Sequence, residues 1–139
     1  MDEVEQLTNE MHDFFNRFTS WETSVIRSSD LTLSESHAIE VLGVYGRMNM
    51  KTLAEKLAVT TGTVTITVDR LEKSGYAKRA TTEEDRRAYI IELTPAGKKA
   101  FEEHHKHHQR LTQELIPLLS KDELTTFLRI LQKLNEYLF

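Results

Sequence analysis

Residues 53–93 constrain the fold of this chain more than any other part of its sequence. Two helix-type stretches, 51–57 and 62–74, are separated by a turn at 58–60 and a capping threonine, Thr60 or Thr61, and Gly75 stands where a C′ glycine would end the second helix. Two β-type runs, 76–80 and 88–93, then flank a charged loop, which predicts a hairpin. Two helices joined by so short a turn form a helix-turn-helix, whose second helix enters the DNA major groove.

Helical patterns surround this stretch on both sides. We expect helices at 4–27, from a capping box at 32–35 to near residue 47, from Thr94-Pro95 to about 115, and from a capping box at 120–123 onward. The order is therefore α-α-α-α-β-β-α-α, which is mainly α with a small β wing in a single domain, 1–139. The first helix carries a heavy apolar stripe, for which a partner subunit is one candidate cover. Its members are Leu7, Met11, Phe14, Phe15, Phe18, Trp21 and Val25.

Composition excludes several classes of protein. The chain has 139 residues, 29% of them charged and 39% hydrophobic, which is ordinary for a soluble globular protein. It has no cysteine, so disulfides, thiolate metal sites and thiol-oxidation sensing are excluded, and the pattern fits a reducing cytosol. We expect a cytoplasmic protein, because the sequence shows no signal peptide and no apolar run long enough to span a membrane.

The distribution of charge predicts a nucleic-acid partner despite a net charge of -4. Residues 47–99 contain 11 Lys and Arg against 7 Asp and Glu, whereas the rest of the chain contains 7 against 15. A basic centre between acidic flanks is typical of a local phosphate-binding face. We therefore expect double-stranded DNA as the partner.

The helix at 62–74 is the predicted recognition helix. Helical spacing points Val64, Val68 and Leu71 inward and distributes polar residues over the exposed sides. These polar residues are Thr61, Thr63, Thr65, Thr67 and Arg70. Threonine is a poor helix former, so we expect Thr61, Thr63 and Thr65 to bind bases or phosphates. Gly62 lets the backbone approach DNA, and Arg70 is placed for a phosphate; the alternative is that the threonines only cap and solvate the helix.

The charged loop at 81–87 is the predicted tip of the wing. Arg86 and Arg87 stand there beside Asp85. Cations near the loop are candidate phosphate contacts, namely Lys78, Arg79, Lys51 and Arg47. The alternative is a solvated charged turn.

The segment LAEKLAVTTGTVTITVDRLEKSGYAKRATTEEDRRAYIIELTPAG resembles the winged helix-turn-helix core of the MarR family of transcriptional regulators. Its most specific parts are D-x-R at Asp85 and Arg87, R-L-E-K-S-G at the end of the recognition helix and L-T-P-A-G after the wing. The resemblance implies a homodimer, interlocked through helices in 1–30 and 95–139, whose two lobes, 31–94, bind one pseudopalindromic operator. It implies that Arg87 enters the minor groove and that Asp85 holds the wing, and a repressor is expected.

The family also implies a small amphipathic or phenolic effector bound between the dimer helices and the winged lobe. The candidate lining residues are Phe14, Phe18, Trp21, Tyr45 and Met48. The alternative is that this aromatic stripe is core.

Histidines on the long helix offer another effector. His104 and His108 lie on a 3-4-3-4 apolar seam at a spacing that lets two imidazoles share a metal ion. The cluster resembles the zinc-responsive branch of the family, which implies His37, His104, His108 and Glu22 as zinc ligands. The chain lacks that branch's cysteine, and Ser36 stands where an acidic ligand is expected.

The wing and recognition helix instead resemble the branch that represses fatty-acid synthesis, which does not depend on metal. The seam histidines are then hydrogen-bonded core residues or a pH-sensitive pair. We expect His12, His105 and His107 at the surface.

Two rival functions follow from other readings of the same residues. An enzyme is not expected, because the chain has no H-E-x-x-H, no nucleophile motif and no glycine-rich phosphate loop. A winged-helix adaptor that binds protein instead of DNA is the remaining alternative, against which the basic centre argues.

Overall fold

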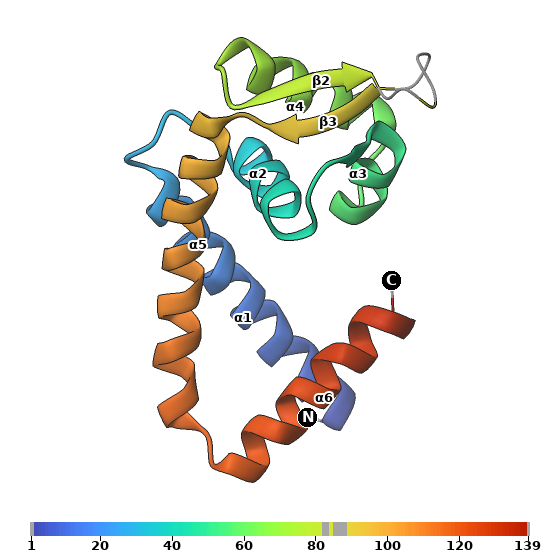
Figure 1. Cartoon of the computed structure of the whole chain (residues 1–139). Helices are drawn as coiled ribbons and strands as arrows, with labels where there is room; N and C mark the ends of the chain where they lie inside the picture. Colours follow the sequence, from blue (N-terminus) through green and yellow to red (C-terminus); the bar gives the residue numbers. More distant parts are fainter. Residues whose placement is uncertain (1, 82–83, 85–88, 139) are drawn as a thin grey trace. The chain divides into compact units, whose positions relative to one another are not determined.

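The computed structural model describes residues 2–81, 84 and 89–138. It divides into two compact units, Met1–His105 and Lys106–Phe139. The boundary falls within the long helix α5, Pro95–Leu115 (Figure 1). The first unit holds the helix-turn-helix and the sheet, and the second holds the C-terminal helix.

The order of the elements confirms the predicted fold class of a mainly α chain with a small β wing. It also adds a short strand before α3 and a 3-10 turn after α5. The elements are α1 Glu3–Ile26, α2 Leu33–Tyr45, β1 Met48–Asn49, α3 Met50–Leu57, α4 Thr61–Lys73, β2 Ala77–Thr81, β3 Tyr89–Leu93, α5 Pro95–Leu115, η1 Ile116–Leu118 and α6 Lys121–Tyr137.

Polar caps fix where the helices begin. Thr32, Asn49 and Thr60 each accept a hydrogen bond from the backbone N–H three residues later, which satisfies an otherwise unpaired donor of the first turn. In α6, Ser120 and Glu123 form the complete reciprocal capping box that the sequence predicts. The starts of these helices are therefore set by local chemistry.

The wing is a three-stranded antiparallel sheet with the order β1-β3-β2. Ala77 pairs with Leu93 at its base, and Met48 pairs with Ile91 on the other side of β3. The strand β1 was not predicted, because two residues are too short to show the alternation that identifies a strand. It ties the start of α3 to the wing.

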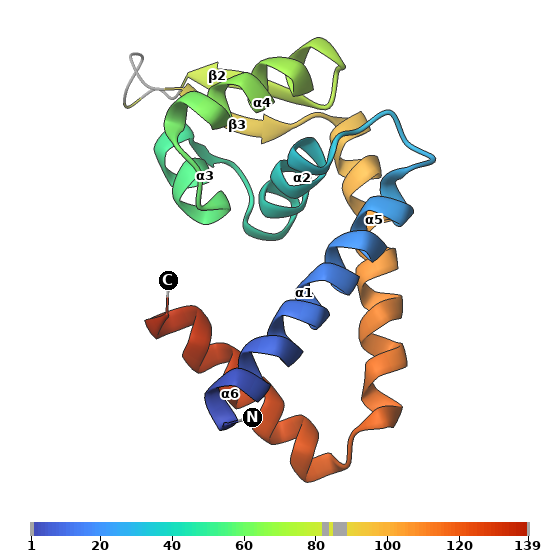
Figure 2. The same cartoon turned by 180° about the vertical axis from the view of Figure 1, so that it is seen from behind.

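The core of the first unit lies between α2, α3, α4 and one face of the sheet, as the two opposite views show (Figures 1 and 2). Its fully buried side chains include Ile39 of α2, Leu53 of α3, Leu71 of α4 and Ile91 of β3. Gly97 allows α5 to start against the wing, because a Cβ there would collide with the carbonyl oxygen of Tyr76. The core thus holds the helix-turn-helix rigidly against the sheet.

Among the residues that the structure describes, no helix combines the length and the apolar character required to cross a membrane.

Candidate nucleic-acid interface

The helix α4, predicted from the sequence to be the recognition helix, has one buried side and one exposed side. Val64, Val68 and Leu71 are completely buried, which confirms the predicted inward stripe. The opposite side exposes Thr61, Gly62, Thr63, Ile66, Asp69 and Arg70. The helix therefore offers a mixed polar and apolar surface with a cation near its C-terminal end.

The threonines of α4 do not all lie where the sequence interpretation placed them. Thr67 is buried, and its hydroxyl donates to the Thr63 carbonyl at 3.3 Å, so its assignment to the exposed side was wrong. The cause is plain from the spacing, because Thr67 lies three residues after Val64 and four before Leu71 on the inward face. The Thr65 hydroxyl donates to the Thr61 carbonyl at 2.7 Å and is half-buried.

The N-terminal turn of α4 is exposed to solvent. Thr60 caps it, and the Thr60 hydroxyl donates to the Thr63 hydroxyl at 3.0 Å. A side chain at Gly62 would meet only the Thr60 hydroxyl oxygen, 3.9 Å away. The exposed Thr61 and Thr63 flank this bare backbone, where amide donors and the helix dipole favour an anion.

A left-handed residue sets the turn between α3 and α4. Ala58 has a φ of 54°, and its amide donates to the Glu55 carbonyl at 3.1 Å. The following amide, of Val59, donates to the Ala54 carbonyl at 3.1 Å. These bonds close the end of α3 and turn the chain into α4, which completes the helix-turn-helix.

The two basic residues predicted on the first wing strand have different surroundings. Arg79 donates from Nη2 to the Asp69 carboxylate at 2.6 Å and from Nη1 to the carboxylate of Glu72. Its guanidinium therefore ties β2 to α4. Lys78 is the more exposed side chain, and its Nζ lies 3.5 Å from the Glu92 carboxylate. Of the two, Lys78 is the cation that faces solvent.

The predicted wing tip, with Asp85, Arg86 and Arg87, lies outside the described residues. The base of the wing is held by two hydrogen bonds. The Tyr76 hydroxyl donates to Asp30 at 2.8 Å, and this bond raises the pKa of Tyr76. The Thr94 hydroxyl donates to the Gly75 carbonyl at 2.6 Å.

Three histidines form pairs between α2 and a neighbouring helix. His37 of α2 lies 2.9 Å from the carboxylate of the buried Glu22 of α1. The buried His104 lies 3.1 Å from the Ser36 hydroxyl. His105, expected at the surface, is half-buried instead: it stacks on Phe101 and lies 2.5 Å from Glu40.

These pairs bear on the predicted zinc ligands. The structure brings His37 and Glu22 together, and it places His104 beside Ser36. His108 belongs to the second unit. Among the described residues, no group of three or more histidine or carboxylate side chains is arranged to hold a metal ion.

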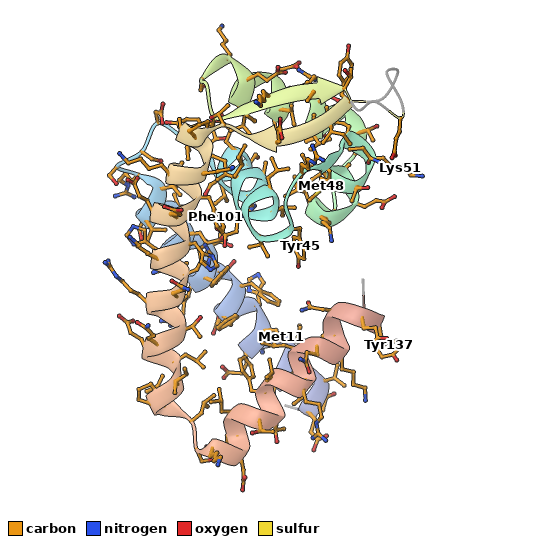
Figure 3. All side chains as sticks on the ribbon, in the orientation of Figure 1. Met11, Tyr45, Met48, Lys51, Phe101 and Tyr137 are labelled. Carbon is orange, nitrogen blue, oxygen red and sulfur yellow. The ribbon has the colours of Figure 1, made fainter. Side chains whose placement is uncertain are left out.

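The predicted effector-lining residues come from α1, from the end of α2 and from β1. Met48 belongs to the core, whereas Tyr45 projects from the end of α2, with Lys56 Nζ 3.9 Å from its ring (Figure 3). Phe14, Phe18 and Trp21 stack along α1, with 6.1 Å and 5.6 Å between successive ring centroids. They form one aromatic row on α1.

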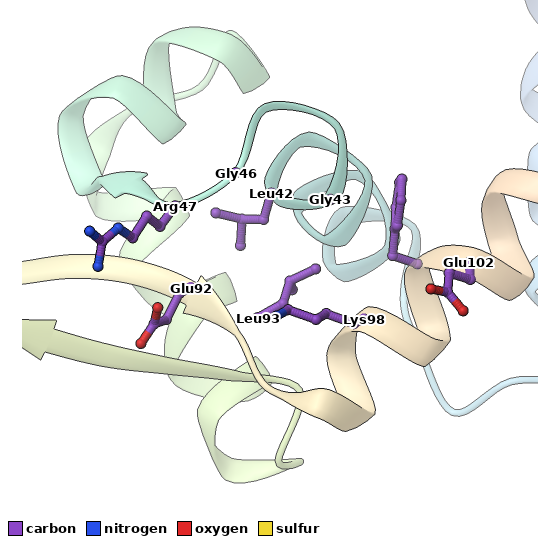
Figure 4. Close-up of a pocket in the computed structure, with 9 residues that line it drawn as sticks. Leu42, Gly43, Gly46, Arg47, Glu92, Leu93, Lys98 and Glu102 are labelled. Carbon is purple, nitrogen blue, oxygen red and sulfur yellow. The ribbon is translucent and has the colours of Figure 1, made fainter.

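A pocket of about 420 Å³ lies elsewhere in the first unit, between the end of α2, β3 and the start of α5 (Figure 4). Leu42, Leu93 and Phe101 form its apolar part. Arg47 and Lys98 contribute cations and Glu92 and Glu102 contribute carboxylates. Gly43 is required beside it, because any Cβ there would collide with the Phe101 ring. The sequence interpretation did not find this pocket.

Comparison with known proteins gives consistent matches. A family model described as MarR family matches residues 31–89. The multiple antibiotic resistance protein MarR of Salmonella typhimurium is 30% identical over 106 residues, which are 76% of this chain and 74% of that protein. YfiV of Bacillus subtilis, an uncharacterised HTH-type transcriptional regulator, is 36% identical over 95 residues. That match covers 68% of this chain but only 59% of YfiV.

The fold also matches a solved DNA complex. The crystal structure of Streptococcus pneumoniae FabT in complex with DNA has a TM-score of 0.88 and 27% sequence identity to this chain. The similarity covers 98% of this chain and 97% of the FabT chain.

Proposed function

Because the chain belongs to the MarR family of transcriptional regulators, we propose that it binds a specific, pseudopalindromic DNA sequence as a homodimer and represses transcription until a small effector releases it. One observation carries the proposal. An anchored helix, α4, exposes the bare backbone of Gly62 between Thr61 and Thr63 at its N-terminus, where recognition helices meet base edges.

The charges around α4 support DNA as the partner. Arg70 is exposed on α4, Lys51 is exposed on α3, and Lys78 is exposed on β2. Cations at these positions suit phosphates on either side of a groove, which fix register without reading sequence. By family resemblance, Arg87 enters the minor groove and Asp85 and Arg86 complete the wing contact. The FabT complex with DNA has the same fold, which supports this assignment.

Selection from random duplexes tests the proposal and supplies an operator. We expect enrichment of a pseudopalindrome and a steep salt dependence of binding. Arg70→Ala is expected to weaken binding and to lower the slope of log K against log salt by about 0.9 for each copy. Lys133→Ala, which removes an exposed cation of α6, is the charge-matched control. A protein-binding adaptor would enrich no sequence.

Exposed apolar side chains support the homodimer. In α1 they are Val4, Leu7, Met11, Phe14 and Phe15, and in α6 they are Leu128, Ile130, Leu131, Leu134 and Tyr137. No residue of α6 is buried. A large exposed apolar surface of this kind marks an interaction site, and a second copy satisfies it by symmetry.

Sedimentation velocity tests the dimer directly. Leu131→Glu combined with Leu134→Glu is expected to convert a dimer into monomers, because it places charge on the apolar face of α6. Gln132→Glu, at an exposed polar position, is the control. A wild-type monomer at micromolar concentration would refute the proposal.

The pocket between α2, β3 and α5 is the proposed effector site. Its volume lies within the range of small-molecule sites, and it combines apolar walls with two cations and two carboxylates, of which Glu92 is paired with Lys78. We expect benzoate, a minimal aromatic anion, to bind at millimolar concentration and to bind more weakly to Lys98→Ala. Equal binding to the variant would instead favour the aromatic row of α1.

A further inference from the structure

Ile66 is an apolar residue on the exposed side of α4, where burial does not stabilise it in the free protein. All of α4 lies within the described residues, and Ile66 is its only large apolar side chain that is exposed, at 55%. Exposing an isoleucine forgoes the free energy of its burial, and a β-branched residue is also less favourable than alanine in a helix. The position is therefore occupied at a cost to the free protein that contact with a partner would recover.

The neighbours of Ile66 define what that partner is. Thr63 lies one turn before it and Arg70 one turn after it, and both are exposed on the same face. Asp69, also on this side, has its carboxylate bonded to Arg79 at 2.6 Å, so its charge is balanced. Ile66 is thus a single apolar side chain among polar ones on the surface proposed above to face the major groove.

The major groove offers one common apolar group, the C5-methyl of thymine. We propose that Ile66 reads a thymine methyl in each half-site and so contributes to operator specificity. This inference rests on the proposed DNA-binding function and adds a named contact to it. Three residues along a helix correspond to about 4.5 Å, so the thymine lies one or two base pairs from the position that Thr63 addresses.

Removing only the methyl group tests the contact. On the operator selected with the wild-type protein, each thymine is replaced in turn by deoxyuridine, which keeps base pairing and loses the methyl. We expect one position per half-site to weaken binding about fourfold, the value for one buried methyl-sized group, and about fifteenfold when both half-sites are changed. Replacement of other thymines in the operator supplies the internal comparison.

The protein variant completes the double-mutant cycle. Ile66→Ala is expected to bind the thymine operator about as weakly as the wild type binds the deoxyuridine operator, and to show no further loss on deoxyuridine. Val59→Ala, at an exposed apolar position in the preceding turn, is expected to keep the loss at the Ile66 position. Circular dichroism of Ile66→Ala should match the wild type, because the side chain is more than half exposed.

The outcomes separate the two proposals. Failure of the wild type to select any sequence overturns the proposed function, and this inference with it. A selected operator with no thymine sensitive to deoxyuridine overturns the Ile66 contact alone. A full deoxyuridine penalty that persists in Ile66→Ala assigns the methyl to another side chain and also overturns it.

Discussion

Replacing Arg79 with alanine removes the ion pairs that hold the wing strand β2 to α4. The guanidinium binds the Asp69 carboxylate at 2.6 Å and the Glu72 carboxylate through its other terminal nitrogen. The Arg79 side chain is 22% exposed, whereas Asp69 is 59% and Glu72 is 32% exposed. The variant therefore loses two charge-assisted hydrogen bonds and leaves two carboxylates close together.

The magnitude follows from that exposure. A hydrogen bond to a charged group contributes about 1.5 to 3 kcal/mol when well shielded, but exposed ion pairs contribute only about 0.2 to 1 kcal/mol. The ion pair with the mostly exposed Asp69 should contribute close to the lower range, and the pair with the partly buried Glu72 should contribute an amount between the two ranges. We therefore expect Arg79→Ala to lower the free energy of unfolding by about 1 to 2 kcal/mol in urea titrations. Arg79→Lys should recover less than half of it, because one ammonium does not span both carboxylates.

The effect on DNA binding distinguishes this structural brace, the Arg79 ion pairs between β2 and α4, from a phosphate contact. A guanidinium already neutralised by two carboxylates releases few counterions from DNA, so Arg79→Ala should leave the salt slope of binding nearly unchanged. The adjacent Lys78→Ala should behave in the opposite way. Lys78 is 60% exposed and its Nζ lies 3.5 Å from the Glu92 carboxylate, so its loss should lower the slope by about 0.9 per copy and hardly change stability.

Fluorescence anisotropy over a range of salt concentrations, beside urea unfolding, gives both readouts on the same proteins. An Arg79→Ala protein with wild-type unfolding and a salt slope reduced by about 0.9 per copy would refute the brace. It would restore the sequence-based assignment of Arg79 to a phosphate.

Three further predictions concern stability. Gly97→Ala should lower the free energy of unfolding by about 1 to 3 kcal/mol, because its Cβ collides with the Tyr76 carbonyl, whereas Gly62→Ala, with open space, should not. Tyr76→Phe should cost about 0.5 to 1 kcal/mol at neutral pH by removing the bond to Asp30. Because that bond raises the Tyr76 pKa above 10.0, the stabilisation is complete below pH 10 and is lost as the pH rises through the folded-state pKa, so the variant should show a flatter alkaline limb in pH-dependent melts. The hydrogen bond from the backbone amide of the α6 N-cap lowers the pKa of Glu123 below 4.5. The stabilisation from this bond is therefore present above pH 4.5 and is lost as the pH falls through the folded-state pKa. Glu123→Gln should flatten the acid limb of helicity measured by circular dichroism.

The local features of this fold could be predicted from sequence because their causes are local. The caps at Thr32 and Ser120 lie three residues from their partners, and Gly75 has the positive φ of 83° that a C′ glycine supplies. Thr67 was predictable as well, since its spacing from Val64 and Leu71 places it on the buried face. The threonines of α4 share a residue type but not a face of the helix, so residue type alone does not predict their exposure.

The cross-helix contacts could not be predicted, because they join residues far apart in the chain. His105 lies four residues after Phe101 on the same face of α5, which placed it inward, but nothing local identified Glu40 as its partner 65 residues away. The same holds for Arg79, whose sequence context reads as a basic wing residue. Its carboxylate partners become visible only when α4 and β2 are packed together.

The helix α2 connects α5 to α4, the proposed recognition helix. One face contacts α5 at a helical spacing: Ser36 meets His104, Glu40 meets His105, and the bare backbone of Gly43 meets the ring of Phe101. The other face buries Ala38, Ile39 and Leu42 in the same core as Val64, Val68 and Leu71 of α4. A close-packed interior has low compressibility and transmits strain, and Gly43 packs so closely on the Phe101 ring that a Cβ would collide with it. Because α2 packs on both α5 and α4, a change in the pocket beside Gly43 would reach α4 by way of α2.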